Sequence, residues 1–265
     1  MNAMVPFSWR TRVEDIVIFG AGVQALWHAR LILMLRGDEV TRITFVNQCR
    51  ERAEALIETV SRENESRWKS ACVLDFICAG RSDAQVQIKH RLVAVDCVFC
   101  TTPSRAPLFP AEYLMEREGV GRPFVSAVGS WQVDMIELHP GLLRYVVGAP
   151  WGYNPVTGEE RGVVLVDDRG YVLENSGEAV RSGLVAEDMV ELGQIISLRS
   201  GTVPALSGRR VEEMYKFVSE GFVVYKSIGV SLTDLTVADA ILALKQRKEA
   251  HGVKRADGGV EKHLI

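Results

Sequence analysis

A glycine-rich turn between a strand pattern and a helix pattern, close to the start of the chain, constrains the fold most strongly. Residues 15–20, "DIVIFG", form a mostly apolar run of strand length, which is typical of a strand buried on both faces in a parallel sheet. Over residues 23–36 apolar side chains recur at helical spacing. A strand, a G-x-G turn and a helix in this order predict a β–α unit whose turn can receive the phosphates of a dinucleotide.

Each glycine of this turn has a separate physical role. Gly20 permits the tight turn, and Gly22 lets the backbone approach a pyrophosphate, which the free N–H groups and dipole of the helix N-terminus then stabilise. The third position of the motif is Ala25, whose methyl group still allows the helix to pack closely on the strand. A tight turn without a ligand is the alternative interpretation of the same residues.

Strand and helix patterns alternate along the first half of the chain and are looser after Gly129. We expect further strands at 42–47, 71–77, 96–102, 123–129, 162–168 and 221–229, and further helices at 50–64, 83–94 and 186–198. This alternation predicts an α/β fold with a Rossmann-type, doubly wound parallel sheet.

The expected organisation has four segments. They are an N-terminal remnant (1–12), a dinucleotide-binding domain (13–230), a C-terminal helix (231–252) and a flexible tail (253–265). Within the C-terminal helix, residues 232–244 carry an apolar face with no evident partner in the chain. We therefore expect a homodimer or a partner polypeptide to cover that face.

Composition excludes several classes of function. Of the 265 residues, 47% are apolar and 25% charged, and the net charge of −3 gives no reason to expect nucleic acid or an anionic membrane as a partner. No apolar run reaches the length of a membrane span, and the first residues lack the apolar core of a signal peptide, so we expect a cytoplasmic protein.

The cysteines and histidines do not predict a metal site. Cys97 and Cys100 are three residues apart on an expected strand, where side chains at that spacing face opposite ways. None of the five histidines lies in a ligand pattern such as H-E-x-x-H. Buried, reduced thiols are the favoured interpretation, and we expect no metal.

The end of the second expected strand bears on the choice of cofactor. An acidic side chain there would accept hydrogen bonds from the adenosine ribose of NAD and repel a 2′-phosphate. This chain has Asn47 instead, followed by Arg50 and Arg52, either of which could pair with a 2′-phosphate. NADP(H) is therefore favoured and NAD(H) stays possible, because Glu51 and Glu54 lie close by and the arginines could be only a solvated helix face.

Four stretches together resemble the ornithine cyclodeaminase and mu-crystallin family. They are "GAGVQA" (20–25), "CTTPSRAPLF" (100–109), "FVSAVGSWQVDMIEL" (124–138) and "YKSIGVSLTDLTVADAIL" (225–242), and they stand in the order found in that family. The resemblance implies a Rossmann domain whose bound nicotinamide faces a substrate pocket roofed by a separate domain. It also implies chemistry on imines and imino acids: their formation or reduction, or the oxidation of amino acids by the reverse hydride transfer.

The resemblance also implies roles for single residues around the cofactor. The implied contacts are Val23 and Gln24 with the pyrophosphate, Asn47 with the adenosine ribose, Thr102 with the cofactor cleft, Ser126, Ala127 and Val128 with the nicotinamide ribose, Ser227 with the nicotinamide end, and Ile228 with substrate. All of these follow expected parallel strands at their carboxyl ends, where doubly wound sheets bind ligands.

Two departures from the family limit what the resemblance implies. Cyclodeaminases carry a catalytic aspartate two residues after the glycine of the A-V-G turn, where this chain has Trp131, which cannot exchange a proton as a carboxylate does. Trp131 could stack on a ring, wall the pocket or simply pack, and Asp134 is the nearest ionisable group, with a surface role as its alternative. Deaminating cyclisation is therefore not expected, whereas hydride transfer to an imine is.

The second departure concerns the segment that supplies the substrate pocket. In family members a large N-terminal part contributes the dimerising sheet and the basic residues that hold the substrate carboxylate, but here twelve residues precede Val13. Arg10 and Arg12 lie in this segment, and no motif match assigns them that role. We expect an oxidoreductase that is active in some assembled form; a catalytically inactive or truncated NADP(H)-binding protein is the alternative.

Overall fold

The computed structural model describes residues 2–116, 121–201, 208–229, 239, 241–243 and 245–246. The chain divides into two compact units, Met1–Ile228 and Gly229–Ile265, and the fold described below is that of the first unit. Of the expected C-terminal helix at 232–244, most residues lie outside the described part, whereas the described Ile241 and Leu242 are helical and exposed.

Helices and strands alternate along the first unit. The strands are β1 (Asp15–Phe19), β2 (Arg42–Asn47), β3 (Val73–Cys78), β4 (Cys97–Cys100), β5 (Phe124–Ala127), β6 (Val164–Val166), β7 (Met189–Glu191) and β8 (Val223–Lys226). The helices are α1 (Met4–Ser8), α2 (Val23–Arg36), α3 (Arg50–Ser66), α4 (Ala84–Leu92), α5 (Glu112–Met115), α6 (Pro140–Val147), α7 (Arg169–Asn175), α8 (Gly177–Ser182), α9 (Leu192–Arg199) and α10 (Gly208–Glu220).

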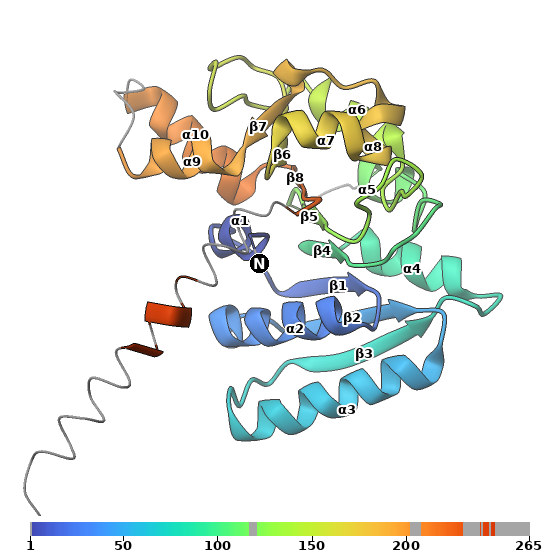
Figure 1. Ribbon diagram of the computed structural model, residues 1–265. Coiled ribbons are helices and arrows are strands. Elements are labelled where there is room, and N and C mark those ends of the chain that lie inside the picture. The colour runs from blue at the N-terminus through green and yellow to red at the C-terminus, as the bar shows by residue number, and fades with distance from the viewer. Residues whose placement is uncertain are drawn as a thin grey trace, which may run out of the picture. The chain divides into compact units, whose positions relative to one another are not determined.

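All strand pairs of the sheet are parallel, as the strand–helix alternation predicts. The strand order is β3-β2-β1-β4-β5-β8-β6-β7, which runs from the bottom to the top of Figure 1. The order reverses direction between β1 and β4, and a doubly wound sheet binds its ligand at the carboxyl ends of the strands flanking such a point.

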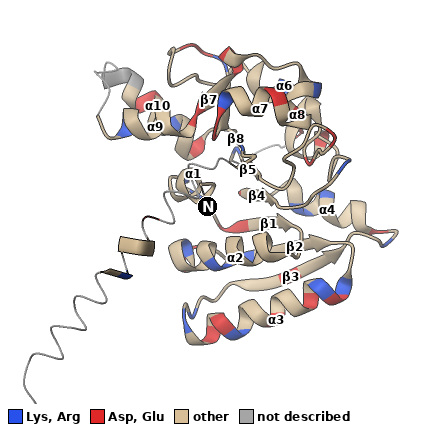
Figure 2. Cartoon of the chain, in the orientation of Figure 1, with Lys and Arg blue, Asp and Glu red and all other residues tan. Residues whose placement is uncertain are grey.

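Side chains that alternate along each strand bury both faces of the sheet. On β1, Ile16 and Ile18 enter a core formed with α1, α2, α3, α9 and α10. Val17 and Phe19 enter a second core formed with helices α4 to α8. Figure 2 shows the charged residues of α3, where Arg and Glu are interspersed.

Two cysteines of β4 bear out the argument from strand geometry. Cys97 packs in the core on the α2 side of the sheet, and Cys100 packs in the opposite core. Both are fully buried, and neither forms a disulfide.

The N-terminal segment packs into the first unit. Phe7 of α1 is fully buried and meets Phe99 of β4 edge-on, with ring centroids 5.6 Å apart. Arg10 is also buried, and its guanidinium donates hydrogen bonds to the backbone carbonyl oxygens of Val218, Gly221 and Arg122 at 3.1, 2.9 and 2.6 Å. These bonds tie residues from distant parts of the sequence together at the amino edge of the sheet.

One expected element was wrong and several were missed. The helix expected at 186–198 is a short 3-10 turn (Ala186–Asp188), strand β7 and helix α9 in succession. Strand β7 pairs with β6, so burial between two helical layers overrides the helical pattern there. Helices α1, α5, α6, α7, α8 and α10 were not expected. Of these, α1, α5, α7 and α8 are too short to show a helical period in the sequence.

Among the described residues, no helix combines the length and the apolar character that crossing a membrane requires.

Candidate functional site

A row of residues across six strands forms the carboxyl edge of the sheet. The ladder aligns Val46, Phe19, Cys100, Ala127, Lys226 and Val166, so the next residue of each strand belongs to one row. The ladder bonds continue into this row, for example from Thr101 N to Phe19 O at 3.0 Å and from Ser227 N to Ala127 O at 3.1 Å. We call it the carboxyl-edge row: Asn47, Gly20, Thr101, Val128, Ser227 and Asp167.

The glycine turn has room for a ligand beside one of its two glycines. Gly20 has φ of +115°, and a Cβ there would lie 2.6 Å from Thr101 Oγ1, so the fold itself requires this glycine. Gly22 is exposed, and a Cβ there would meet no described atom within 4 Å. The open space at Gly22 is where a ligand backbone could approach, which fits a bound pyrophosphate.

The N-terminus of α2 offers unscreened backbone donors. Gly22 is the N-cap, no side chain caps the helix, and its first turn holds no acidic residue. Val23 is 70% exposed and Gln24 is also exposed. The first N–H groups of α2 therefore face the space above the carboxyl-edge row, where the helix dipole favours an anion.

At the far end of the row, the residues after β2 are partly engaged with one another. Asn47 Nδ2 donates to the carbonyl oxygen of Cys49 at 2.8 Å. Arg50 pairs with Glu54 at 3.3 Å, and its guanidinium lies 5.0 Å from the centre of the Phe76 ring. Arg52 is exposed. Two cationic groups thus follow β2, one of which is already held by a carboxylate.

A buried carboxylate joins the loops that follow β4 and β5. Glu137 Oε1 accepts hydrogen bonds from Thr102 N at 2.7 Å and from Thr102 Oγ1 at 3.1 Å. Its Oε2 accepts from Gly129 N at 2.7 Å and from Ser130 N at 3.2 Å. Glu137 has no exposed surface. Four donors from two loops therefore converge on one side chain, and these loops directly follow the row residues Thr101 and Val128.

Lys226 and Glu178 complete this cluster, which we call the buried ion cluster (Glu137, Glu178, Lys226). Lys226 Nζ donates to the carbonyl oxygen and to Oγ of Ser130, at 2.5 and 2.7 Å, and lies 3.7 Å from Glu178 Oε2. Glu178 Oε1 accepts from Ser130 Oγ at 2.5 Å and from Glu137 N at 2.6 Å. The cluster thereby ties the carboxyl end of β8 to the loop after β5.

Burial raises the pKa of Glu137. The nearby charge of Lys226 and the backbone N–H groups of Thr102 and Gly129 oppose this rise without cancelling it. Burial therefore outweighs a favourable set of partners in setting the protonation of this group.

A second carboxylate fixes the end of β8 from the other side. Asp167 follows β6, and its Oδ2 accepts from Ser227 Oγ at 2.6 Å and from Ile228 N at 3.2 Å. Its Oδ1 accepts from Asp168 N at 3.1 Å. Ser227 and Ile228 are half-buried, so the serine hydroxyl is held in place yet reaches the surface of the row.

The structure distributes the other predicted residues unevenly. Ser126 and Ala127 lie within β5 with no exposed surface, so their side chains support the edge from below. Val128 is half-buried in the row, and Trp131 is 52% exposed in the loop beyond it. Asp134 makes an exposed ion pair with Arg105 at 3.1 Å. The predicted residues thus gather at one edge, where they remain candidates.

The residues that organise this edge were missed by the sequence analysis. They are Glu137, Asp167, Glu178 and Lys226. Two of them carried a local signal, because Lys226 and Asp167 place a charge directly after a run of apolar strand residues. Glu137 and Glu178 carried none, since their partners lie up to 48 residues away along the chain, as for Glu178 and Ser130.

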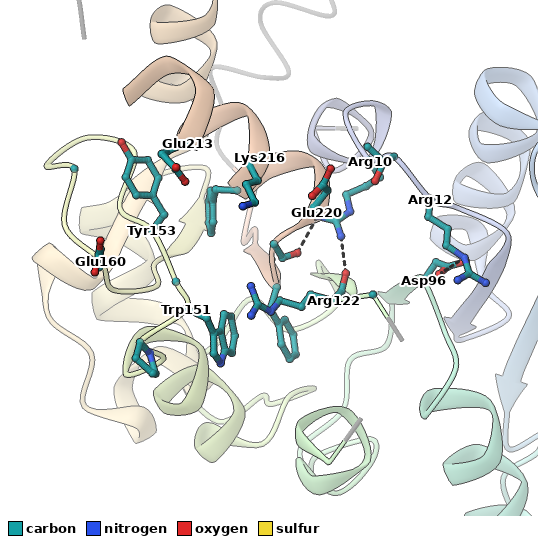
Figure 3. Close-up of a pocket in the computed structure, with 18 residues that line it drawn as sticks. Arg10, Arg12, Asp96, Arg122, Trp151, Tyr153, Glu160, Glu213, Lys216 and Glu220 are labelled. Atoms are coloured by element: carbon teal, nitrogen blue, oxygen red, sulfur yellow. Dashed lines mark hydrogen bonds and ion pairs between the residues drawn. The ribbon is translucent and has the colours of Figure 1, made fainter. Parts of the chain in front are cut away.

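A large cavity lies at the opposite edge of the sheet. Its volume is about 1050 Å³, and it is lined by residues that precede strands, including Asp96, Arg122 and Phe222, and by α10. Figure 3 shows Arg122 beside Trp151, where the guanidinium lies 4.2 Å from the ring centre. A doubly wound sheet binds dinucleotides at the carboxyl edge, so this cavity is separate from the candidate site.

The basic residues of the N-terminal segment lie at this amino edge and are engaged. Arg10 donates to three backbone carbonyl oxygens, as described above, and Figure 3 draws one of these bonds, to Arg122. Arg12 pairs with Asp96 at 3.2 Å and with Glu14 at 3.3 Å. Neither side chain is at the carboxyl-edge row.

No family model matches the chain. A curated relative from Dictyostelium discoideum, described as an uncharacterized cyclodeaminase, is 22% identical over 239 residues, which cover 86% of this chain and 57% of the relative. The chain therefore spans little more than half the length of this relative.

Several solved structures have the same fold. The probable ornithine cyclodeaminase of Bordetella pertussis is 20% identical with a TM-score of 0.59, and the match covers 89% of this chain and 60% of that one. The iminosuccinate reductase of Paracoccus denitrificans in complex with NAD+ is 16% identical with a TM-score of 0.62, and the match covers 94% of this chain and 63% of that one. The pyrroline-2-carboxylate reductase of Thermococcus litoralis with NADH and L-proline is 17% identical with a TM-score of 0.61, and the match covers 95% of this chain and 63% of that one.

We predict that Glu137→Gln destabilises the protein by about 3 kcal/mol, because the amide N–H₂ would face backbone donors that now reach a carboxylate. Urea unfolding at neutral pH measures this loss. Asp134→Asn, which removes an exposed ion pair, is the matched control and should change the free energy of unfolding by less than about 1 kcal/mol.

A comparison of wild type with Glu137→Gln at several pH values tests whether the pKa of Glu137 is raised. Since the folded-state pKa of Glu137 lies above its ordinary value of 4.5, its contribution to stability is present below that pH and is lost as pH rises through the folded pKa. The stability difference between wild type and Glu137→Gln should therefore shrink as pH rises from 4.5. A difference that grows with pH would contradict the raised pKa.

Proposed function

Because the chain has the fold of the ornithine cyclodeaminase and mu-crystallin family, we propose that it is an NAD(P)-dependent oxidoreductase of this type. The proposed reaction is the reduction of an imine, ketimine or imino acid by hydride transfer. The alternative is an NADP(H)-binding protein without catalysis.

The observation that carries the proposal is the open glycine turn on the carboxyl-edge row. Gly22 and the uncapped N-terminus of α2 provide space and N–H donors for a pyrophosphate. Ser227 lies three strands further along the row, or about 14 Å away at about 4.8 Å per strand. A dinucleotide whose pyrophosphate lies at Gly22 would therefore extend its nicotinamide toward Ser227.

Different residues along the row would bind different parts of such a cofactor. Asn47 would meet the adenosine ribose, Val23 and Gln24 the pyrophosphate, and Thr102 and Val128 the nicotinamide ribose, with Ser126 and Ala127 as the buried floor. A nicotinamide cofactor supplies a hydride, and the protein supplies position and electrostatics. The buried ion cluster holds the loops of Thr102 and Gly129 in register, so it preorganises this half of the site.

The proposed substrate class follows from the site and from the solved relatives. Two of these are named as reductases of iminosuccinate and of pyrroline-2-carboxylate, which are both small C=N compounds with carboxylate groups. Trp131 stands where cyclodeaminases carry their catalytic aspartate, and it is half exposed beside the row. An indole can wall an apolar or ring-shaped substrate but cannot exchange its proton, which favours reduction over deaminating cyclisation.

One observation favours the alternative of binding without catalysis. Arg10 and Arg12 are held at the amino edge, so they do not clamp a substrate carboxylate at the row. In the assembled protein a homodimer partner or another polypeptide would have to complete the pocket around Ile228 and Trp131.

We predict that Gly22→Leu abolishes binding of NADPH, because its side chain fills space that no described atom occupies and blocks backbone approach. The fold should tolerate the change for the same reason. Gly193→Val is the matched control, at an exposed glycine of α9 with equally open surroundings. Nucleotide fluorescence titration reports binding, and unchanged affinity in Gly22→Leu would remove the glycine turn from the site.

We predict tighter binding of NADPH than of NADH, since Asn47 replaces an acid and two arginines follow it. The double variant Arg50→Ala/Arg52→Ala should lower the affinity for NADPH about tenfold and leave that for NADH unchanged. Arg62→Ala, on the same helix at its far end, is the control. A tenfold preference of the wild type for NADH would refute the assignment of NADP(H).

We predict that the protein oxidises NADPH when pyrroline-2-carboxylate or iminosuccinate is added, and that it releases neither ammonia nor proline from ornithine. Loss of the absorbance of the reduced nicotinamide measures the first reaction, with Gly22→Leu as the blank. Binding of NADPH without turnover of either imine would favour the non-catalytic alternative. Proline formed from ornithine would contradict the argument from Trp131.

A further inference from the structure

The pair Asp167–Ser227 fixes the direction of a hydrogen bond at one end of the carboxyl-edge row. Both oxygens of Asp167 accept backbone N–H groups, from Asp168 at 3.1 Å and from Ile228 at 3.2 Å. A carboxylate surrounded by donors in this way is itself an acceptor. The bond of 2.6 Å between Ser227 Oγ and Asp167 Oδ2 therefore uses the only hydrogen of the serine hydroxyl.

The remaining capacity of Ser227 Oγ is that of an acceptor. A hydroxyl has one O–H to donate and two lone pairs. The buried hydroxyl of Tyr225, two residues earlier on β8, interacts with the side chain of Ser227 and can occupy one of these two lone pairs. Ser227 is half-buried, so its oxygen reaches the row with its second lone pair available for a ligand.

A fixed acceptor discriminates between ligands that differ by one hydrogen. A ligand with an N–H at this point gains a bond, whereas a ligand with a carbonyl, ether or methyl group leaves the oxygen unpaired or repelled. A free serine hydroxyl would not discriminate in this way, because it could rotate to donate instead. The specificity therefore depends on Asp167, which acts on the ligand through Ser227.

We propose that Asp167 is a positioning residue that makes Ser227 an obligate hydrogen-bond acceptor, so that this end of the site selects a ligand group carrying an N–H. The inference rests on the proposed function, in which the nicotinamide end of the cofactor and the substrate meet near Ser227. Two groups there carry the required chemistry: the carboxamide of the nicotinamide and the protonated nitrogen of an amine or imine. Both are N–H donors, and two binding experiments separate them.

The first experiment compares NADPH with its acetylpyridine analogue, in which a methyl group replaces the amide N–H₂. The second compares L-proline with tetrahydrofuran-2-carboxylate, in which an oxygen replaces the ring nitrogen, in the presence of saturating NADP+. Calorimetry measures both on the full chain. The wild type should prefer the N–H form about tenfold in the arm whose ligand reaches Ser227.

Four variants test whether Ser227 and Asp167 cause the preference for the N–H form of the ligand. Ser227→Ala removes the acceptor, and Asp167→Ala frees the hydroxyl to rotate, so each should reduce the tenfold preference to near unity. Ser227→Thr keeps a hydroxyl and should keep the preference. Asp168→Asn removes a neighbouring charge but can still accept the capping bond from Tyr171 N, now 2.8 Å, and should also keep it. If Asp167→Ala does not fold, the pair Ser227→Ala and Ser227→Thr still decides.

The outcomes separate this inference from the proposed function. Equal binding of the N–H form and its counterpart by the wild type in both arms, or a preference that survives Ser227→Ala, overturns the role of Asp167 while the dinucleotide site stands. Absence of binding by either dinucleotide overturns the proposed function together with this inference. A preference lost in Ser227→Ala and Asp167→Ala alone supports it, and the arm in which this occurs identifies the group.

Discussion

The carboxyl edge of this sheet depends on one buried carboxylate, Glu137. Parallel strands end in loops whose backbone N–H groups have no partner in the ladder, and two such loops here, after β4 and β5, turn inward toward a site with no exposed surface. Leaving those donors unpaired would cost more than burying one acceptor for all of them. Lys226 offsets part of the negative charge of that acceptor, whereas Glu178 opposes it, and both residues join the end of β8 to the same point.

This arrangement explains why the two sides of the row differ. On the Gly20 side the backbone donors of α2 are left open, which is what a bound anion requires. On the β4–β5–β8 side several loop donors already bind side chains of the protein, so those loops are held in place by the protein itself. The open N-terminus of α2 suits the binding of a phosphate at one end of the row. The loops held in place after β4 and β5 suit the orientation of a reactive ring at the other end.

The sequence predicted the parts of this site that depend on local geometry. Strand β1, the glycine turn and α2 were expected within one residue of their observed bounds, because apolar periodicity and a φ above zero at Gly20 are properties of a short stretch of chain. It could not predict the buried ion cluster, whose members pair across distant loops. It was wrong over 186–198, where a three-residue strand is too short to show an alternating pattern and takes its structure from pairing with β6.

The two glycines of the turn show how fold and ligand binding can be told apart within one motif. Gly20 is required by the protein alone, since a Cβ there would collide with Thr101 and the backbone has a left-handed φ. Gly22 meets neither constraint: nothing described approaches it, and its φ of −96° suits any residue. A glycine that the folded chain does not need leaves space for something outside the chain. The same reasoning applies to Ser227, whose hydrogen is donated to Asp167 and whose oxygen keeps one lone pair beyond the one that Tyr225 can occupy.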